Sequence, residues 1–172
     1  MDDLPDRIGN EVPRLRRYAQ ALCRRKIEAD DLVQECILRA LSRKHLWQEG
    51  TDLRAWLFTI LHNQYVNHVR RSARHGMSVD VSDLDEEIRQ LPGQDKRLEL
   101  RDLDRALARL PGAQRTVILL VGLEGMDYET AAKVVGVPVG TVRSRLSRGR
   151  EELRRLMGIK PDSAEANIVI AA

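Results

Sequence analysis

Six arginines lie within residues 140–156, GTVRSRLSRGREELRRL, and their spacing suits one helix. On such a helix, guanidinium groups can clamp phosphates or read guanine edges, and serine hydroxyls can do either more weakly. A helix at about 100° per residue would turn four residues toward a core: Val142, Leu146, Gly149 and Leu153. The arginines and serines would then face outward, either as an ordinary solvated surface or as a surface that binds a polyanion.

The segment before this helix favours the polyanion, because it has the spacing of a helix-turn-helix. A short helix over residues 128–135 is followed by Gly136, and a second helix begins near Gly140. Glycine suits the turn, and Ala132 is small where the two helices must cross. A second helix of 18 residues would be about 27 Å long and would fit a major groove roughly 12 Å wide. The segment therefore predicts DNA binding.

Residues that could support catalysis or bind a metal are scarce. His62 and His68 lie six positions apart with no nearby pair of carboxylates. Cys23 and Cys36 lack CxxC spacing and sit in apolar helical patterns, which favours core packing over redox or metal chemistry. We expect no enzymatic activity, no metal and no cofactor.

The charge is polarised along the chain. Residues 76–104 hold nine acids against four bases, a net charge of −5, whereas residues 126–160 hold eight bases against four acids, a net of +4. This separation predicts distinct surfaces with distinct partners. No apolar run approaches the roughly 20 residues that a membrane span needs, and the N-terminus lacks an apolar secretory core. We expect a cytoplasmic protein without membrane insertion.

The apolar pattern predicts two small helical domains. Residues 29–45 form an amphipathic helix, residues 15–22 carry an apolar stripe before it, and a third helix begins after a cap at Thr51 or Asp52. An aromatic content of 3% also suits helices more than sheets. The expected fold is all-α, with two helical domains joined by a flexible acidic linker. Its predicted parts are a first domain over 1–76, a linker over 77–94, a second domain over 95–160 and a loose tail over 161–172.

Both predicted domains resemble one family. Residues 128–150 resemble the signature YEEIAEILGVPVGTVRSRLxRAR in region 4 of the extracytoplasmic-function (ECF) sigma factors of bacterial RNA polymerase. In the first domain, ADDLVQECILRAL resembles region 2.2 of that family, and LRAWLFTILHNQYVNHVRR resembles regions 2.3 and 2.4. Together the matches cover residues 12–75 and 96–157. The blocks GTDLRAWLFTIL and LVGLEGMDYETAA also resemble the general-stress subgroup.

The resemblance implies a promoter-recognition subunit, with region 2 as a bundle of three or four helices and region 4 as the helix-turn-helix. By this resemblance, the residues for the clamp helices of the polymerase largest subunit are Asp31, Leu32, Gln34, Glu35 and Leu38. The residues that match the segment for the −10 element are Asn63, Asn67, Arg70 and Arg71, and Trp47 and His62 are further candidates for contact with it. The residues for the −35 element are Thr141, Arg143, Ser144, Arg145, Ser147 and Arg148.

Promoter opening requires a pocket for an unstacked base, and the loop over residues 44–52 is placed to form one with Trp47. Core packing of Trp47 fits the sequence equally well. The chain departs from the family at His62, where Arg is usual, and at Asn67, where Asp is common. Ser147 also occupies a variable position of the reading helix. The resemblance therefore does not carry over the preferred promoter sequence.

The resemblance also implies regulation by an anti-sigma factor that clamps both domains. Two alternatives compete with a sigma factor. A sigma-like decoy would only bind the anti-sigma factor, but such decoys carry a receiver domain of roughly 120 residues, for which 172 residues filled by two helical domains leave no room. A helix-turn-helix DNA-binding regulator would explain the second domain and leave ADDLVQE without a role.

Overall fold

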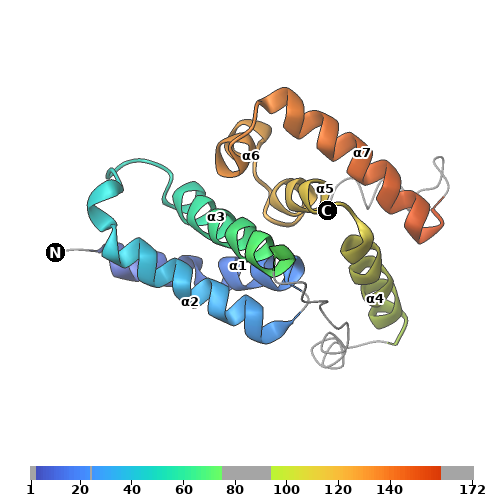
Figure 1. Cartoon of the computed structure of the whole chain (residues 1–172), viewed down its shortest axis with the longest axis horizontal. Helices are drawn as coiled ribbons and strands as arrows, with labels where there is room; N and C mark the ends of the chain where they lie inside the picture. Colours follow the sequence, from blue (N-terminus) through green and yellow to red (C-terminus); the bar gives the residue numbers. More distant parts are fainter. Residues whose placement is uncertain (1–2, 24, 75–93, 160–172) are drawn as a thin grey trace. The chain divides into compact units, whose positions relative to one another are not determined.

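The computed structural model describes residues 3–23, 25–74 and 94–159. Every regular element in those ranges is helical, which confirms the predicted all-α class (Figure 1). The chain divides into two compact units. Below, the helices up to residue 74 are called the first unit and the helices from residue 94 on are called the second unit, and each is described by itself. The predicted tail, and the predicted linker up to residue 93, lie outside the described residues.

Three long helices form the first unit. Its elements are α1 (Leu4–Leu22), α2 (Lys26–Ser42), the 3-10 turn η1 (Lys44–Leu46) and α3 (Leu53–Arg74). The cap of α3 is Asp52, one of the two predicted candidates, whose carboxylate accepts the Ala55 N–H at 2.9 Å. The other candidate, Thr51, donates its hydroxyl to the Gln48 carbonyl at 2.6 Å instead.

The core of the first unit lies where α1, α2 and α3 meet. The rings of Tyr18 and Phe58 join α1 to α3, with 5.1 Å between their centroids. Cys36 joins α2 to α3 by donating its thiol to the Leu57 carbonyl at 3.4 Å. Fully buried apolar side chains of this size contribute about 1.5–3 kcal/mol each. The largest of them in this unit are Tyr18, Phe58, Ile8, Leu15, Leu22, Leu57 and Leu61.

The prediction of core packing is confirmed for Cys36, which is buried, whereas Cys23 is half-buried; neither cysteine forms a disulfide within the described residues. Burial raises the pKa of Cys36 from an ordinary 9.0 to about 12, and the Glu35 carboxylate adds to this rise while Arg39 opposes it. Cys36 is therefore a neutral thiol in the folded protein.

The second unit contains the predicted helix-turn-helix. Its elements are α4 (Gln94–Arg109), α5 (Gly112–Ile118), the π-helical turn η4 (Leu119–Leu123), α6 (Tyr128–Val135) and α7 (Val139–Met157). A glycine in the left-handed conformation makes the turn before α7, since Gly136 has φ +68°. Ala106, Leu110 and Leu153 are buried together, so α4 packs against α7.

Helix α7 also packs closely on α5, and Gly149 is the residue that permits it. A Cβ atom added at Gly149 would lie 2.7 Å from Ile118 Cδ1 and 3.2 Å from Gln114 Cβ. A glycine inside a helix costs about 1 kcal/mol relative to alanine. The close approach to α5 explains why α7 carries a glycine at a position that the apolar pattern predicted to face the core.

Two further properties concern membranes and metals. Within the described ranges, no helix combines the length and the apolar character needed to cross a bilayer. The same residues contain no group of three or more His, Cys, Asp or Glu side chains that could hold a metal ion.

Candidate nucleic-acid interface

Helix α7 separates a buried apolar face from an exposed polar one. The four residues predicted to face the core are all buried: Val142, Leu146, Gly149 and Leu153. The residues predicted to read the −35 element all lie outside that set. Arg143, Ser144, Ser147 and Arg148 are exposed, and Thr141 and Arg145 are half-buried. The helix therefore presents guanidinium and hydroxyl groups on one continuous outer surface.

Both ends of α7 are fixed by local backbone hydrogen bonds. At the start, Pro138 offers its carbonyl to Thr141 N–H at 2.9 Å and to Val142 N–H at 3.2 Å. At the end, Gly158 adopts φ +67°, and the Ile159 N–H reaches back to the Arg154 carbonyl at 3.0 Å. The basic surface of α7 thus has a defined length.

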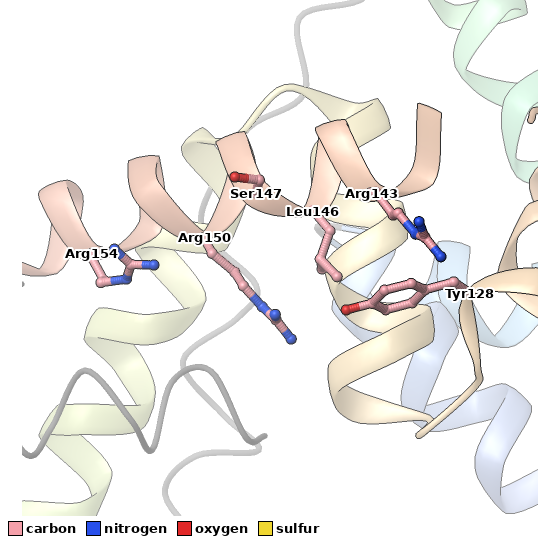
Figure 2. A pocket seen from close by; sticks show the side chains of 6 residues that line it. All are labelled: Tyr128, Arg143, Leu146, Ser147, Arg150 and Arg154. Atoms are coloured by element: carbon pink, nitrogen blue, oxygen red, sulfur yellow. The ribbon is translucent and has the colours of Figure 1, made fainter. Parts of the chain in front are cut away.

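A pocket of about 210 Å³ lies between the start of α6 and the face of α7 (Figure 2). The Arg143 guanidinium lies over the Tyr128 ring, 5.9 Å from its centroid, and Arg150 reaches toward the same pocket from a later turn. The lining residues are Tyr128, Arg143, Leu146, Ser147, Arg150 and Arg154. Three guanidinium groups give this pocket a positive potential, which suits an anion such as a DNA phosphate.

One arginine of α7, Arg155, is already paired with a carboxylate and is less available to bind a phosphate. The Arg155 guanidinium donates from Nε to Glu152 Oε2 at 2.8 Å. This hydrogen bond lowers the pKa of Glu152 and raises the pKa of Arg155, so the pair stays charged. Arg155 is exposed and Glu152 is half-buried, and a phosphate would have to compete with Glu152 for Arg155.

In the first unit, the predicted −10 residues divide between the surface and the interior. Asn63, Asn67, Arg70 and Arg71 are exposed along the second half of α3. His62 is only 9% exposed, so its side chain is directed inward in this structure. The four exposed residues form the polar surface that α3 offers.

Trp47 lies in the loop after η1 and is half-buried. The Arg7 guanidinium of α1 lies over its ring, 4.9 Å from the centroid, so one face of the indole is covered. The indole N–H is buried and has no hydrogen-bond partner within the described residues. Sequence reasoning missed Arg7, because nothing in the local pattern of α1 connects it to a residue 40 positions later.

The predicted polymerase-binding residues lie on α2. Asp31, Gln34 and Glu35 are exposed, and Leu38 is 68% exposed. Leu32 differs, because it is 7% exposed and belongs to the core. The exposed Ile27 and Leu41 extend the surface along α2 in both directions from Leu38, so polar and apolar groups alternate there.

Two family models match the chain. Residues 8–62 match the Sigma2 domain of PhyR, and residues 100–153 match region 4 of Sigma-70. The chain is similar to the ECF RNA polymerase sigma factor EcfG of Rhodopseudomonas palustris, with 42% identity over 95% of this chain and 89% of that one.

Solved structures show the same fold. The sigma factor RpoE in complex with the anti-sigma factor NepR from Bartonella quintana has a TM-score of 0.81 and 32% identity, over 93% of this chain and 99% of that one. The anti-anti-sigma factor PhyR, also complexed with NepR from Bartonella quintana, has a TM-score of 0.59 and 15% identity, over 88% of this chain and 49% of that one, and shows the fold alone. From these matches, the chain belongs to the ECF RNA polymerase sigma factors, the transcription initiation factors that act with core RNA polymerase on promoter DNA.

Proposed function

We propose that α7 reads the −35 element, that the exposed end of α3 meets the −10 element, and that the outer face of α2 binds core RNA polymerase. The observation that carries this proposal is the division of α7, whose four core residues are buried, while four of its six candidate −35 residues are exposed and the other two are half-buried. A helix of this kind can enter a major groove without unpacking the second unit. The protein has no catalytic role of its own and acts in the cytoplasm.

Runoff transcription with core enzyme, across a library of promoters, tests this proposal directly. The purified chain should direct core polymerase to a subset of promoters that share sequences near −35 and −10. Transcription that is independent of the added chain would contradict the assignment. Tight duplex binding without polymerase would instead indicate an ordinary helix-turn-helix regulator.

The α2 surface can be tested by a charge reversal. Glu35 is exposed and, among the residues that the structure describes, forms its ion pair with Arg39 of the same helix, at 3.4 Å, so Glu35→Lys should leave the fold intact. The substitution should weaken binding of core polymerase while the melting temperature stays unchanged. Lys26→Glu, a reversal at the exposed first position of α2, is a control for the effect of charge alone.

We also propose that an anti-sigma factor of the NepR type holds this protein inactive. The support is the likeness to RpoE, which was solved in complex with NepR. Each unit is small, so a partner that grips both would also stabilise them by mass action. Pull-down from cells under different growth conditions should recover such an inhibitor. Full transcriptional activity in every growth state, with no inhibitor recovered, would contradict this proposal.

A sigma-like decoy remains a second candidate, because the first half of the chain matches the Sigma2 domain of PhyR. The arginines on α7 favour a sigma factor, since a decoy that only binds the inhibitor has no need of a DNA-reading surface. The runoff assay separates the two, because a decoy would bind the inhibitor and yield no promoter-dependent transcript.

A further inference from the structure

Tyr128 is placed to control the orientation of Arg143. The Arg143 guanidinium lies 5.9 Å from the centroid of the Tyr128 ring, within the distance at which a cation is attracted to an aromatic face. Figure 2 shows the two side chains together at one end of the pocket, with Arg150 and Arg154 farther along α7. Arg143 is exposed whereas Tyr128 is half-buried, so the ring is the more constrained partner.

The Tyr128 ring is carried by the first residue of a well-anchored helix. The Asp127 carboxylate caps α6 by accepting the Thr130 N–H at 2.6 Å, and the Asp127 carbonyl accepts the Ala131 N–H at 2.9 Å. Met126 and Ala131 are buried on either side of this cap. The backbone that carries Tyr128 is thus held by hydrogen bonds and packing that do not involve Arg143.

Arg143 needs such a support to discriminate between bases. Its side chain has many rotamers, and a free arginine would lose them on binding. Within the described residues, the Arg143 side chain interacts with the Tyr128 ring and forms no ion pair with a carboxylate. Attraction to the ring uses none of the guanidinium hydrogen-bond donors, so its N–H groups stay free to form the paired hydrogen bonds that recognise guanine.

We propose that Tyr128 is a positioning residue for promoter recognition: its aromatic ring orients the Arg143 guanidinium for a base edge of the −35 element. This inference rests on the proposed function, in which α7 reads that element. It assigns to α6 a share in specificity, although Tyr128 need not touch a base itself.

The experiment measures transcription by holoenzyme, assembled from the full chain and core polymerase, over all bases at each −35 position. Arg143→Ala first identifies the position that Arg143 reads. Tyr128→Leu, which removes the aromatic face, should lower discrimination at that position by about two- to fivefold and leave the other positions unchanged. Tyr128→Phe is the matched control, because it keeps the ring and removes only the hydroxyl, and its discrimination should equal that of the original chain. In the Arg143→Ala background, Tyr128→Leu should cause no further loss.

Several outcomes would overturn the inference. An equal loss on all −35 sequences would assign Tyr128 to the fold or to a phosphate contact, and a Tyr128→Phe variant as impaired as Tyr128→Leu would assign the effect to the hydroxyl. If Tyr128→Leu lowers the melting temperature, Tyr128→Trp replaces it, and this larger aromatic face must keep or sharpen the discrimination. If Arg143→Ala itself leaves the −35 preference unchanged, the proposed role of Arg143 in reading that element fails, and the inference fails with it. An effect of Arg143→Ala without an effect of Tyr128→Leu refutes the inference alone.

Discussion

Helices α7 and α3 are both proposed to face DNA, but they distribute polar side chains differently. The buried face of α7 consists of Val142, Leu146, Gly149 and Leu153, so none of the polar residues of the helix is classed as buried. Helix α3 buries His62 at 9% exposure and Gln64 at 3%, beside the exposed Asn63. When the buried face of a helix is wholly apolar, the polar residues in its sequence identify the exposed face. When a helix also buries amides and imidazoles, polar residue type alone does not identify that face.

The largest expected effect is on the alkylation rate of Cys36, in the core of the first unit. Its pKa of about 12, against an ordinary 9.0, lowers the thiolate fraction near pH 8 about a thousandfold. Alkylation of Cys36 in the folded protein should therefore be slower than in denaturant by at least about that factor, with the half-buried Cys23 as an internal reference. Mass spectrometry of the labelled peptides measures both rates.

The same pKa gives a pH dependence of stability whose sign is fixed. Because the folded pKa is raised, the contribution of the neutral Cys36 thiol is fully present below pH 9.0 and is lost as the pH rises toward about 12. Cys36→Ala should remove that part of the alkaline destabilisation. Equal alkaline slopes for the two proteins, or labelling of Cys36 as fast as in denaturant, would show that the core of the first unit is more open than described.

Gly149→Val tests the close packing of α7 against α5 in the second unit. The added Cβ would meet Ile118 Cδ1 at 2.7 Å, and the branched methyl groups need further room. Overpacking of this kind should destabilise the second unit by about 2–3 kcal/mol, measured by urea unfolding. Gly140→Ala is the matched control on the same helix, because a Cβ there meets nothing within 4 Å. If both variants were equally stable, the close contact between α5 and α7 would not be needed for stability.

Arg148→Ala compares the exposed faces of the two helices. If Arg148 reads a base, its loss should cost about 1–3 kcal/mol at one −35 position and little elsewhere. Arg70→Ala on α3 should instead weaken binding to all promoter sequences similarly, as expected of a contact to the backbone of separated strands. Holoenzyme binding to a promoter library measures both profiles. A uniform loss for Arg148→Ala would demote it to a phosphate contact.

Gln64→Met should give the smallest effect, and it should stabilise the protein where the substitution at Gly149 destabilises it. Both polar atoms of the Gln64 amide are buried without a hydrogen-bond partner in the described part of the chain. Replacing this amide by an apolar group of similar shape should stabilise the first unit by about 1 kcal/mol in thermal unfolding. Asn63→Met, at the exposed neighbouring position, should change stability little. Destabilisation by Gln64→Met would mean that the amide does have a partner.

The sequence predicts α7 better than it predicts α3. The face of α7, the turn at Gly136 and the cap at Asp52 follow from apolar spacing and local backbone chemistry, and the structure confirms them. The burial of Leu32 and His62 depends on how three helices pack, which periodicity alone does not resolve. The contact between Arg7 and Trp47 joins residues far apart in the chain, so no local pattern could reveal it.

The left-handed glycine at Gly158 also sets how far α7 can reach. Arg143 and Arg154 are 11 residues apart, which is about 16 Å along the helix axis. A straight helix of this length diverges from the curved floor of a major groove. In the proposed complex, with the first turns of α7 among base edges, the arginines of the last turn would therefore lie nearer to sugar and phosphate than to bases.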